Sequence, residues 1–319
     1  MTKASRIGVT PPRINAYPRL RAEVKAALPD AVLYEGGKTM GEDELIAFLA
    51  DCDAAIIGFE PLTEKVLAAL PKLKVVAKFG NGYESIDFEA LRRHGVRFGY
   101  TWGVNKLAVA ELALCFMIAA QRWVSTLNVA MRAGERPTPR DGRLLSGRTV
   151  GIHGCGNIGK EVVRLLAPFG CTILATDIKD YADFYRTHNV SPVPMDELLA
   201  RSEVLTLHLP KTCLTRGLYD RDAIGRLRRE CVLINTCRGG IVDETALLER
   251  LDAGTLMAAA FDVFAIEPAQ NDALLRHPNM LATPHIGASA DEIRITMVRA
   301  AIRGLTDHEE VDPARFYAE

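Results

Sequence analysis

The stretch Thr149-Val150-Gly151-Ile152-His153-Gly154-Cys155-Gly156-Asn157-Ile158-Gly159 decides the fold. An apolar run typical of a buried strand passes directly into a Gly-x-Gly-x-x-Gly turn, and residues 160–169 continue with helical spacing. In such a turn Gly154 permits the tight bend, Gly156 lets the backbone approach a pyrophosphate, and Gly159 allows close helix-to-strand packing. Because phosphates are favoured at a helix N-terminus, the stretch predicts a dinucleotide-binding strand, turn and helix.

Asp177 indicates which dinucleotide binds. It lies 18 residues past Gly159, at the end of the next expected strand. A carboxylate there can accept hydrogen bonds from both ribose hydroxyls of NAD and would repel the 2′-phosphate of NADP. The pattern therefore favours NAD, and the alternative is a purely structural turn with a capping aspartate. His153, at the end of the buried strand, is expected to pack without a functional role.

Strand-like and helical segments alternate on both sides of this motif. Upstream strands are expected at residues 7–10, 54–58, 73–78 and 96–99, and downstream strands at residues 149–153, 172–176, 204–207, 232–236, 257–263 and 281–283. A long, largely apolar helix from Val104 to about Ala133 joins the two series, and a final amphipathic helix covers about residues 290–305. Strands that alternate with helices are typical of parallel sheets in α/β proteins.

The composition favours a small-molecule partner. The 319 residues are 48% hydrophobic, which is enough for two domain cores. Lysine plus arginine (39) nearly balances aspartate plus glutamate (40), so no net field attracts nucleic acid or an anionic membrane. The longest apolar run, residues 107–120, contains Glu111 and is shorter than the roughly 20 residues that span a bilayer. We therefore expect neither a nucleic-acid nor a membrane partner.

The cysteines and the N-terminus point to a cytoplasmic protein without a metal site. The seven cysteines form no Cys-x-x-Cys pair and no cluster with histidine at metal-ligand spacing. Such a scattered, odd set is expected in a reducing compartment. The first six residues lead directly into an expected strand, so we expect no signal peptide.

Three downstream segments each place a charged or titratable residue just after an apolar strand. They contain Arg238 in residues 235–240, Glu267 in residues 261–268 and His285 in residues 282–287. In an open parallel sheet the carboxyl ends of the strands open into the ligand crevice, so these side chains are expected to converge. Singly, each could be structural: a strand cap, an exposed turn residue and a core histidine.

Together these residue types suit the oxidation of a 2-hydroxy acid or the reverse reduction. Histidine can accept the C2 hydroxyl proton near neutral pH, and arginine can bind a carboxylate through two parallel hydrogen bonds. A glutamate bonded to the other imidazole nitrogen would orient the ring and stabilise its charged form.

From about residue 73 to residue 290 the sequence also resembles the D-isomer-specific 2-hydroxyacid dehydrogenase family, with most similarity to its D-3-phosphoglycerate dehydrogenases. The resemblance implies that Arg238 binds substrate, His285 is the acid/base, and Glu267 is its partner, at separations of 29 and then 18 residues. It implies NAD-dependent, reversible hydride transfer. It further implies cofactor contacts from Asn157, Ile158, Leu209, Pro210, Thr236, Cys237, Asp262 and Gly287, with Asp262 at the nicotinamide carboxamide.

The resemblance also implies a substrate loop, formed by Lys78, Gly80, Asn81 and Gly82, whose backbone amides face the substrate carboxylate. Here the sequence departs from the phosphoglycerate enzymes, because Lys78 replaces an arginine and residues 57–63 contain no arginine to hold a phosphate. Phe59, Glu60 and Tyr83 could instead shape a pocket for a different group. Whether the substrate is phosphorylated stays open.

We therefore predict an α/β protein of two doubly wound parallel-sheet domains. Residues 1–100, with 289–319 returning to them, form a flavodoxin-like substrate-binding domain, and residues 101–288 form a Rossmann NAD-binding domain. The chemistry is expected in the crevice between them, and similar proteins form homodimers through the long helix. The alternatives are a non-catalytic, corepressor-like NAD sensor and a formate- or phosphite-type dehydrogenase on the same fold.

Overall fold

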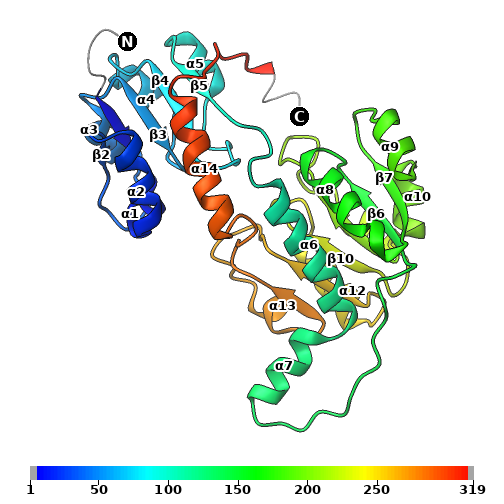
Figure 1. Ribbon diagram of the computed structural model, residues 1–319. Helices are drawn as coiled ribbons and strands as arrows, with labels where there is room; N and C mark the ends of the chain where they lie inside the picture. Colours follow the sequence, from blue (N-terminus) through cyan, green and yellow to red (C-terminus); the bar gives the residue numbers. More distant parts are fainter. Residues whose placement is uncertain (1–5, 315–319) are drawn as a thin grey trace. The chain divides into compact units, whose positions relative to one another are not determined.

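The computed structural model describes residues 6–314, so the expectations for residues 1–5 and 315–319 lie outside the described part. The chain divides into two compact units (Figure 1). The N-terminal unit consists of Met1–Asn105 with Ser289–Glu319, and the central unit is Lys106–Ala288. The sequence placed the first boundary at residue 100 and the second at residue 288.

The N-terminal unit is built on a five-stranded parallel sheet with the order β2-β1-β3-β4-β5. Its strands are β1 (Ile7–Val9), β2 (Val32–Leu33), β3 (Ala54–Ile57), β4 (Val75–Lys78) and β5 (Arg97–Gly99). Its helices are α1 (Pro12–Ala16), α2 (Pro18–Ala27), α3 (Glu42–Leu49), α4 (Glu64–Ala69), α5 (Phe88–Arg93) and the returning α14 (Asp291–Gly304). The strand order is that of a flavodoxin-like doubly wound sheet.

The central unit has a seven-stranded parallel sheet with the order β12-β11-β10-β9-β6-β7-β8. Its strands are β6 (Thr149–His153), β7 (Thr172–Thr176), β8 (Val190–Pro192), β9 (Val204–Leu207), β10 (Val232–Asn235), β11 (Ala258–Phe261) and β12 (Met280–Ala282). Its helices are α6 (Lys106–Gln121), α7 (Val124–Arg132), α8 (Asn157–Leu166), α9 (Ala182–His188), α10 (Met195–Arg201), α11 (Arg221–Arg226), α12 (Glu244–Asp252) and α13 (Asp272–Arg276). The order reverses at β6 and β9, as in a Rossmann fold.

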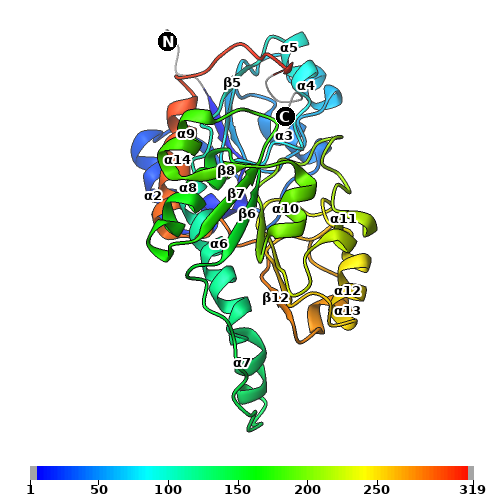
Figure 2. The ribbon, with the colours of Figure 1, turned by 90° about the vertical axis from the view of Figure 1, so that its right-hand side faces the viewer.

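Alternate residues of the central strands pack against helices on opposite faces of the sheet, which Figure 2 shows nearly edge-on. Leu205, Leu233 and Phe261 join a core with α10, α11, α12 and α13. Val204 and Ile234 join a second core with α6 and α8. Strands that are apolar on both faces are typical of buried parallel sheets, so the predicted doubly wound α/β fold is confirmed.

The structure differs from the sequence prediction at the expected long helix. It breaks at Trp123, whose φ of 57° is left-handed, and α6 and α7 meet at a bend of 70°. Trp123 is buried, and its Nε1 donates to the carbonyl of Asp141 at 3.0 Å. Tertiary packing of the indole therefore accompanies a break that no glycine or proline marks in the sequence.

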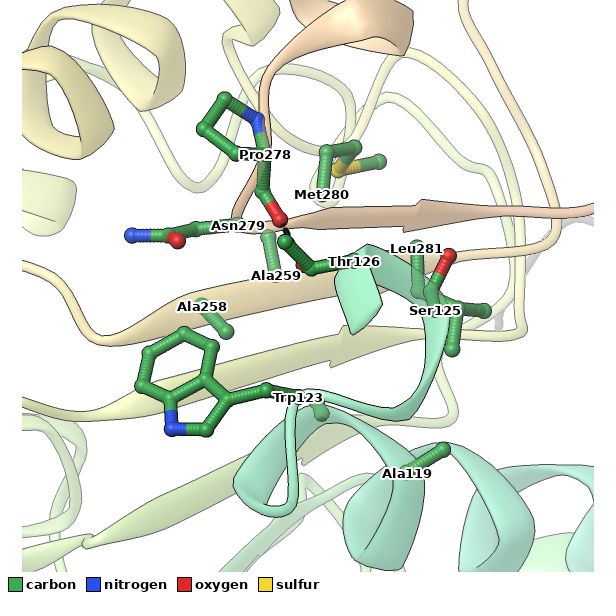
Figure 3. Close-up of a pocket in the computed structure, with 11 residues that line it drawn as sticks. Ala119, Trp123, Ser125, Thr126, Ala258, Ala259, Pro278, Asn279, Met280 and Leu281 are labelled. Atoms are coloured by element: carbon green, nitrogen blue, oxygen red, sulfur yellow. Dashed lines mark hydrogen bonds between the residues drawn. The ribbon is translucent and has the colours of Figure 1, made fainter. Parts of the chain in front are cut away.

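None of the α7 residues, all of them described, is buried. In Figure 3, Trp123, Thr126 and the segment Pro278–Leu281 line a hollow between the start of α7 and the starts of β11 and β12. The hydroxyl of Thr126 donates to the carbonyl of Pro278 there. The α7 helix is therefore anchored at its start, and Leu127 also packs against the core, whereas Val129 and Met131 are exposed.

Within residues 6–314 no single helix has the length and apolar character needed to cross a membrane, although the bent pair α6 and α7 together passes that test on length and composition.

Candidate active site

The glycine turn after β6 has the geometry that each glycine was expected to provide. Gly154 has a φ of +92°, and a Cβ there would lie 2.5 Å from the carbonyl oxygen of His208. A Cβ on Gly159 would lie 2.2 Å from the carbonyl oxygen of Gly154, so α8 packs directly onto the turn. A Cβ on Gly156 would have no described heavy atom within 4 Å apart from those of its chain neighbours. The turn is thus closed on its protein side and open at Gly156, where α8 begins.

Asp177, the residue after β7, is held against the same turn. Its Oδ2 accepts from the backbone N–H of Cys155 at 2.6 Å, and its Oδ1 accepts from the N–H of Lys179 at 2.8 Å. These bonds fix the carboxylate beside the glycine turn while each oxygen keeps acceptor capacity. The arrangement suits the recognition of two neighbouring ribose hydroxyls.

Further expected cofactor residues follow β9 and β10 at the same edge of the sheet. The side chain of Leu209 reaches to 3.2 Å from a Cβ built on Gly154, and Pro210 follows it. Thr236 is buried, and its Oγ1 has no hydrogen-bond partner among residues 6–314. Since an unsatisfied buried hydroxyl is costly, Thr236 fits a polar group supplied by a bound ligand. The residues present therefore fit a dinucleotide.

The loop after β10 carries Arg238. Asn235 orders this loop, because its Nδ2 donates to the carbonyl of Arg238 at 3.1 Å and its Oδ1 accepts from the N–H of Cys237 at 3.1 Å. A Cβ on Gly239 would lie 1.7 Å from the carbonyl oxygen of Phe264, so only glycine permits the contact with the loop after β11. Arg238 is half-buried, and its Nη1 donates to the carbonyl of Cys237 at 2.7 Å.

Glu267 and His285 form a hydrogen-bonded pair. Glu267 Oε2 lies 2.7 Å from His285 Nδ1, and Oε1 accepts from the N–H of Phe264 at 3.2 Å. The side chains of the pair are 38% and 41% exposed respectively, so solvent and ligands can reach both. Because Nδ1 is used by the glutamate, Nε2 is the ring nitrogen available to a substrate.

Asp262 holds the histidine loop in place. Its carboxylate is 1% exposed and accepts three hydrogen bonds: Thr283 Oγ1 at 2.5 Å and the backbone N–H groups of Ile286 at 2.7 Å and Gly287 at 2.8 Å. His285, inside this loop, has a φ of 54°, which non-glycine residues rarely adopt. The three bonds therefore stabilise the strained conformation of the loop that carries the His285 ring, a role of Asp262 that sequence reasoning missed.

His153 and His208 are histidines without a proposed catalytic role. Burial lowers the pKa of His153 to about 4, a shift that the nearby carboxylate of Asp177 opposes, and the His153 Nδ1 lies 2.7 Å from the hydroxyl oxygen of Tyr219. Burial lowers the pKa of His208 to about 3. Both rings are therefore neutral near neutral pH and serve packing. Tyr219 is a partner that the sequence did not indicate.

The expected substrate loop belongs to the N-terminal unit. It follows β4, and Gly80 has a φ of +95°. The hydroxyl of Tyr100 donates to the carbonyl of Asn81 at 2.8 Å, and Asn81 Nδ2 donates to Asn105 Oδ1 at 2.7 Å. Lys78 is 3% exposed, and its Nζ donates to the carbonyl of Phe79 at 3.0 Å. These contacts fix the loop within its own unit.

No group of three or more His, Cys, Asp or Glu residues that could hold a metal ion occurs within residues 6–314.

Comparison with known proteins agrees with this geometry. A family model described as "D-isomer specific 2-hydroxyacid dehydrogenase, NAD binding domain" matches residues 114–287, which include the glycine turn, Arg238, Glu267 and His285. A solved glyoxylate reductase from Paecilomyes thermophila superposes with a TM-score of 0.83 at 28% identity, covering 95% of both chains. The central unit therefore contains the NAD-binding domain of this family.

Two relatives are similar at the level of sequence. The D-3-phosphoglycerate dehydrogenase of Mycobacterium tuberculosis is 34% identical over 278 residues, which are 86% of this chain and 52% of the relative. The hydroxypyruvate reductase of Thermotoga maritima is 34% identical over 257 residues, 79% of this chain and 83% of the relative. The chain spans about half the length of the phosphoglycerate dehydrogenases that it matches. The relatives' names refer to different substrates.

Proposed function

The chain belongs to the D-isomer specific 2-hydroxyacid dehydrogenase family, and we propose that it transfers a hydride reversibly between NAD(H) and C2 of a small 2-hydroxy or 2-oxo carboxylate. The observation that carries the proposal is the 2.7 Å contact between His285 Nδ1 and Glu267 Oε2. This pair lies at the carboxyl edge that also carries Arg238 and the glycine turn, because β6, β10, β11 and β12 belong to one parallel sheet.

In the oxidative direction His285 Nε2 accepts the proton of the C2 hydroxyl, and in the reductive direction it returns a proton to the carbonyl oxygen. Glu267 holds the ring through Nδ1 and stabilises the protonated imidazole. Arg238 binds the substrate carboxylate, since a guanidinium matches a carboxylate with two parallel hydrogen bonds. The backbone of Gly80, Asn81 and Gly82, with Lys78, is also proposed to bind substrate.

NAD, when bound, supplies or accepts the hydride. Gly154, Gly156 and Gly159 shape the turn for its pyrophosphate, and Asp177 binds its ribose hydroxyls. Asn157, Ile158, Leu209, Pro210, Thr236, Cys237 and Gly287 are the other proposed contacts. Asp262 acts through the histidine loop, because the hydrogen bonds of its buried carboxylate go to Thr283, Ile286 and Gly287.

The proposal includes a cytoplasmic homodimer. All seven cysteines are free, as expected in a reducing compartment. Several apolar side chains on and near α7 are exposed: Val124 (52%), Val129 (63%), Met131 (59%) and Leu144 (66%). Contact with the same surface of a second copy would bury them.

The test is the absorbance of NADH in the presence of a panel of 2-oxo acids. Oxidation of NADH that depends on one of these acids supports the proposal. Protein that binds NADH but turns over no 2-oxo acid would contradict it and favour an NAD sensor. Adding formate and phosphite with NAD to the same assay distinguishes a dehydrogenase for those donors.

A further inference from the structure

The carboxyl edge of the N-terminal sheet presents aromatic rings on both sides of the Gly80–Gly82 loop. This loop follows β4, which lies between β3 and β5 in the sheet. Phe59 follows β3 and is 62% exposed, and Trp102 follows β5 and is 37% exposed. Isolated exposed apolar residues need no explanation, but these two flank a loop that is proposed to bind substrate.

Phe59 is held beside the loop by its contact with Lys78. The Nζ atom of Lys78 lies 5.2 Å from the centroid of the Phe59 ring and donates to the carbonyl of Phe79. A cation over an aromatic face is an attractive contact. One face of the ring is therefore engaged by the ammonium group, while the exposed area remains for a ligand.

Trp102 belongs to an aromatic cluster that is tied to the loop. Its ring centroid lies 4.8 Å from that of Tyr100 and 6.2 Å from that of Tyr83, both in edge-on arrangements. Tyr100 donates its hydroxyl hydrogen to the carbonyl of Asn81. The indole is thus fixed on the β5 side of the loop, opposite the position of Phe59 along the sheet.

The charges on the β3 side disfavour a phosphate. Glu60, next to Phe59, is 0% exposed, and its Oε2 accepts from the N–H of Gly58 at 2.5 Å. Its other oxygen, Oε1, has no hydrogen-bond partner within residues 6–314. Residues 57–63 contain no arginine or lysine. The nearby cation is Lys78, which is 3% exposed and already donates to the carbonyl of Phe79. A phosphate dianion would also meet the buried carboxylate of Glu60 and the apolar ring of Phe59, both unfavourable surroundings for it.

We propose that Phe59 and Trp102 form the subsite for the group attached to C2, and that the preferred substrate is an unphosphorylated 2-oxo or 2-hydroxy acid with an aromatic or branched apolar side group. This inference rests on the proposed function. Such a group would cover the exposed rings and add apolar contact that a methyl group or a hydrogen cannot provide.

The experiment compares kcat/KM for phenylpyruvate and 4-methyl-2-oxopentanoate with values for pyruvate, glyoxylate, hydroxypyruvate and 3-phosphohydroxypyruvate, using the full chain and NADH. The apolar acids are expected to exceed pyruvate by about tenfold or more, because each added methylene contributes a factor of about 10 or more in a matched pocket. Phe59→Ala should raise KM for phenylpyruvate about tenfold and leave the value for glyoxylate close to the parent's. Phe59→Tyr should retain the preference.

Tyr17→Ala is the matched control, because Tyr17 is an exposed aromatic residue (40%) of the same unit whose ring is in contact with the guanidinium of Arg294 on α14. It should change no substrate preference. If 3-phosphohydroxypyruvate or glyoxylate is the best substrate and Phe59→Ala affects all acids alike, the subsite is wrong while the dehydrogenase proposal stands. If none of the 2-oxo acids supports the oxidation of NADH by the parent protein, the proposed function itself fails.

Discussion

Each sheet has a strand that ends on a buried titratable residue and then enters a glycine-rich turn. In the central unit β6 ends at His153, followed by Gly154 and Gly156. In the N-terminal unit β4 ends at Lys78, followed by Gly80. His153 is 7% exposed and Lys78 is 3% exposed, so both strands carry a polar group into the core.

The two segments differ in the charge of the buried polar side chain and in the groups that surround the turn. His153 loses its charge, since burial lowers its pKa to about 4, whereas the Lys78 ammonium is bound by a carbonyl and an aromatic ring. The first turn is closed by backbone contacts at Gly154, while the second is bordered by aromatic side chains. The same arrangement of strand and turn is therefore proposed to serve phosphate binding in one unit and side-group recognition in the other.

The largest effect is expected on kcat, when His285 is replaced in the pair that it forms with Glu267. A second histidine–glutamate pair, His94 with Glu64, provides the control. His285→Ala should lower kcat by about 10²–10⁴-fold and leave NADH affinity near normal, because the ring acts on the substrate oxygen. Stopped-flow or steady-state rates with NADH fluorescence titration measure both. His94→Ala is the control, since His94 Nε2 lies 2.8 Å from Glu64 Oε1 at the end of α5, away from the proposed chemistry. Parent-like turnover by His285→Ala would remove it as the acid/base.

The sequence predicted the glycine turn and the parallel sheets because both leave a local pattern: the glycine spacing and the alternation of strand-like with helical segments. The doubly wound fold was predicted and is confirmed, whereas the edge strands β2 and β8 were missed, because two or three residues carry almost no periodic signal. The break at Trp123 was missed for a different reason. Its left-handed conformation accompanies a hydrogen bond from the indole to Asp141, 18 residues away, and helix propensity does not encode such a contact.

The site was predictable in residue types but not in its supporting contacts. Strand-end positions identified Arg238, Glu267 and His285, and the structure pairs the last two. The hydrogen bonds from Thr283, Ile286 and Gly287 to Asp262 could not be predicted, because two of the donors are backbone groups whose identity leaves no mark in the sequence. The cofactor and substrate roles of the individual residues stay predictions, and the variants proposed for these residues test them.

Alanine substitutions in the two glycine turns test whether the turns differ in their effects on stability and on NADH affinity. In Gly156→Ala the added Cβ lies within 4 Å of no described heavy atom apart from the chain neighbours, and the φ of −72° with ψ of −147° lies outside the helical and extended regions, so the melting temperature should fall only slightly. The added methyl would face the pyrophosphate, and the Kd for NADH should rise about tenfold or more, which is about 1.4 kcal/mol.

Gly80→Ala should do the reverse. Its φ of +95° is unfavourable for any residue with a Cβ, so the variant should lose about 1–3 kcal/mol of stability and keep its NADH affinity. Calorimetry and NADH fluorescence titration measure the two quantities for each variant. Equal effects of both substitutions on NADH affinity would contradict the division of roles between the turns.

A smaller effect is expected at the carboxylate beside the first turn. Asp177→Ala should shift the ratio of NADH to NADPH efficiency by about tenfold toward NADPH, since a charged hydrogen-bond acceptor and its repulsion of a 2′-phosphate are lost. Asp177→Asn is the control that removes the charge and keeps an acceptor for the N–H of Cys155. An unchanged cofactor preference in both variants would mean that another residue recognises the ribose.

The charge of His153 is expected to make the stability of the protein depend on pH. Its pKa is lowered from 6.5 to about 4, so below about pH 6.5 the unfolded chain binds a proton that the native protein does not. The native protein therefore has no penalty from this residue above about pH 6.5 and loses stability progressively as the pH falls from about 6.5 to about 4, at up to about 1.4 kcal/mol per pH unit. Urea unfolding of a Trp102→Phe protein, in which Trp123 reports on the central unit, measures this slope at about pH 7 and about pH 5. His153→Gln can keep a bond to Tyr219 without titrating, and it should flatten the slope. The same slope in parent and variant would mean that His153 is not the source of the pH dependence.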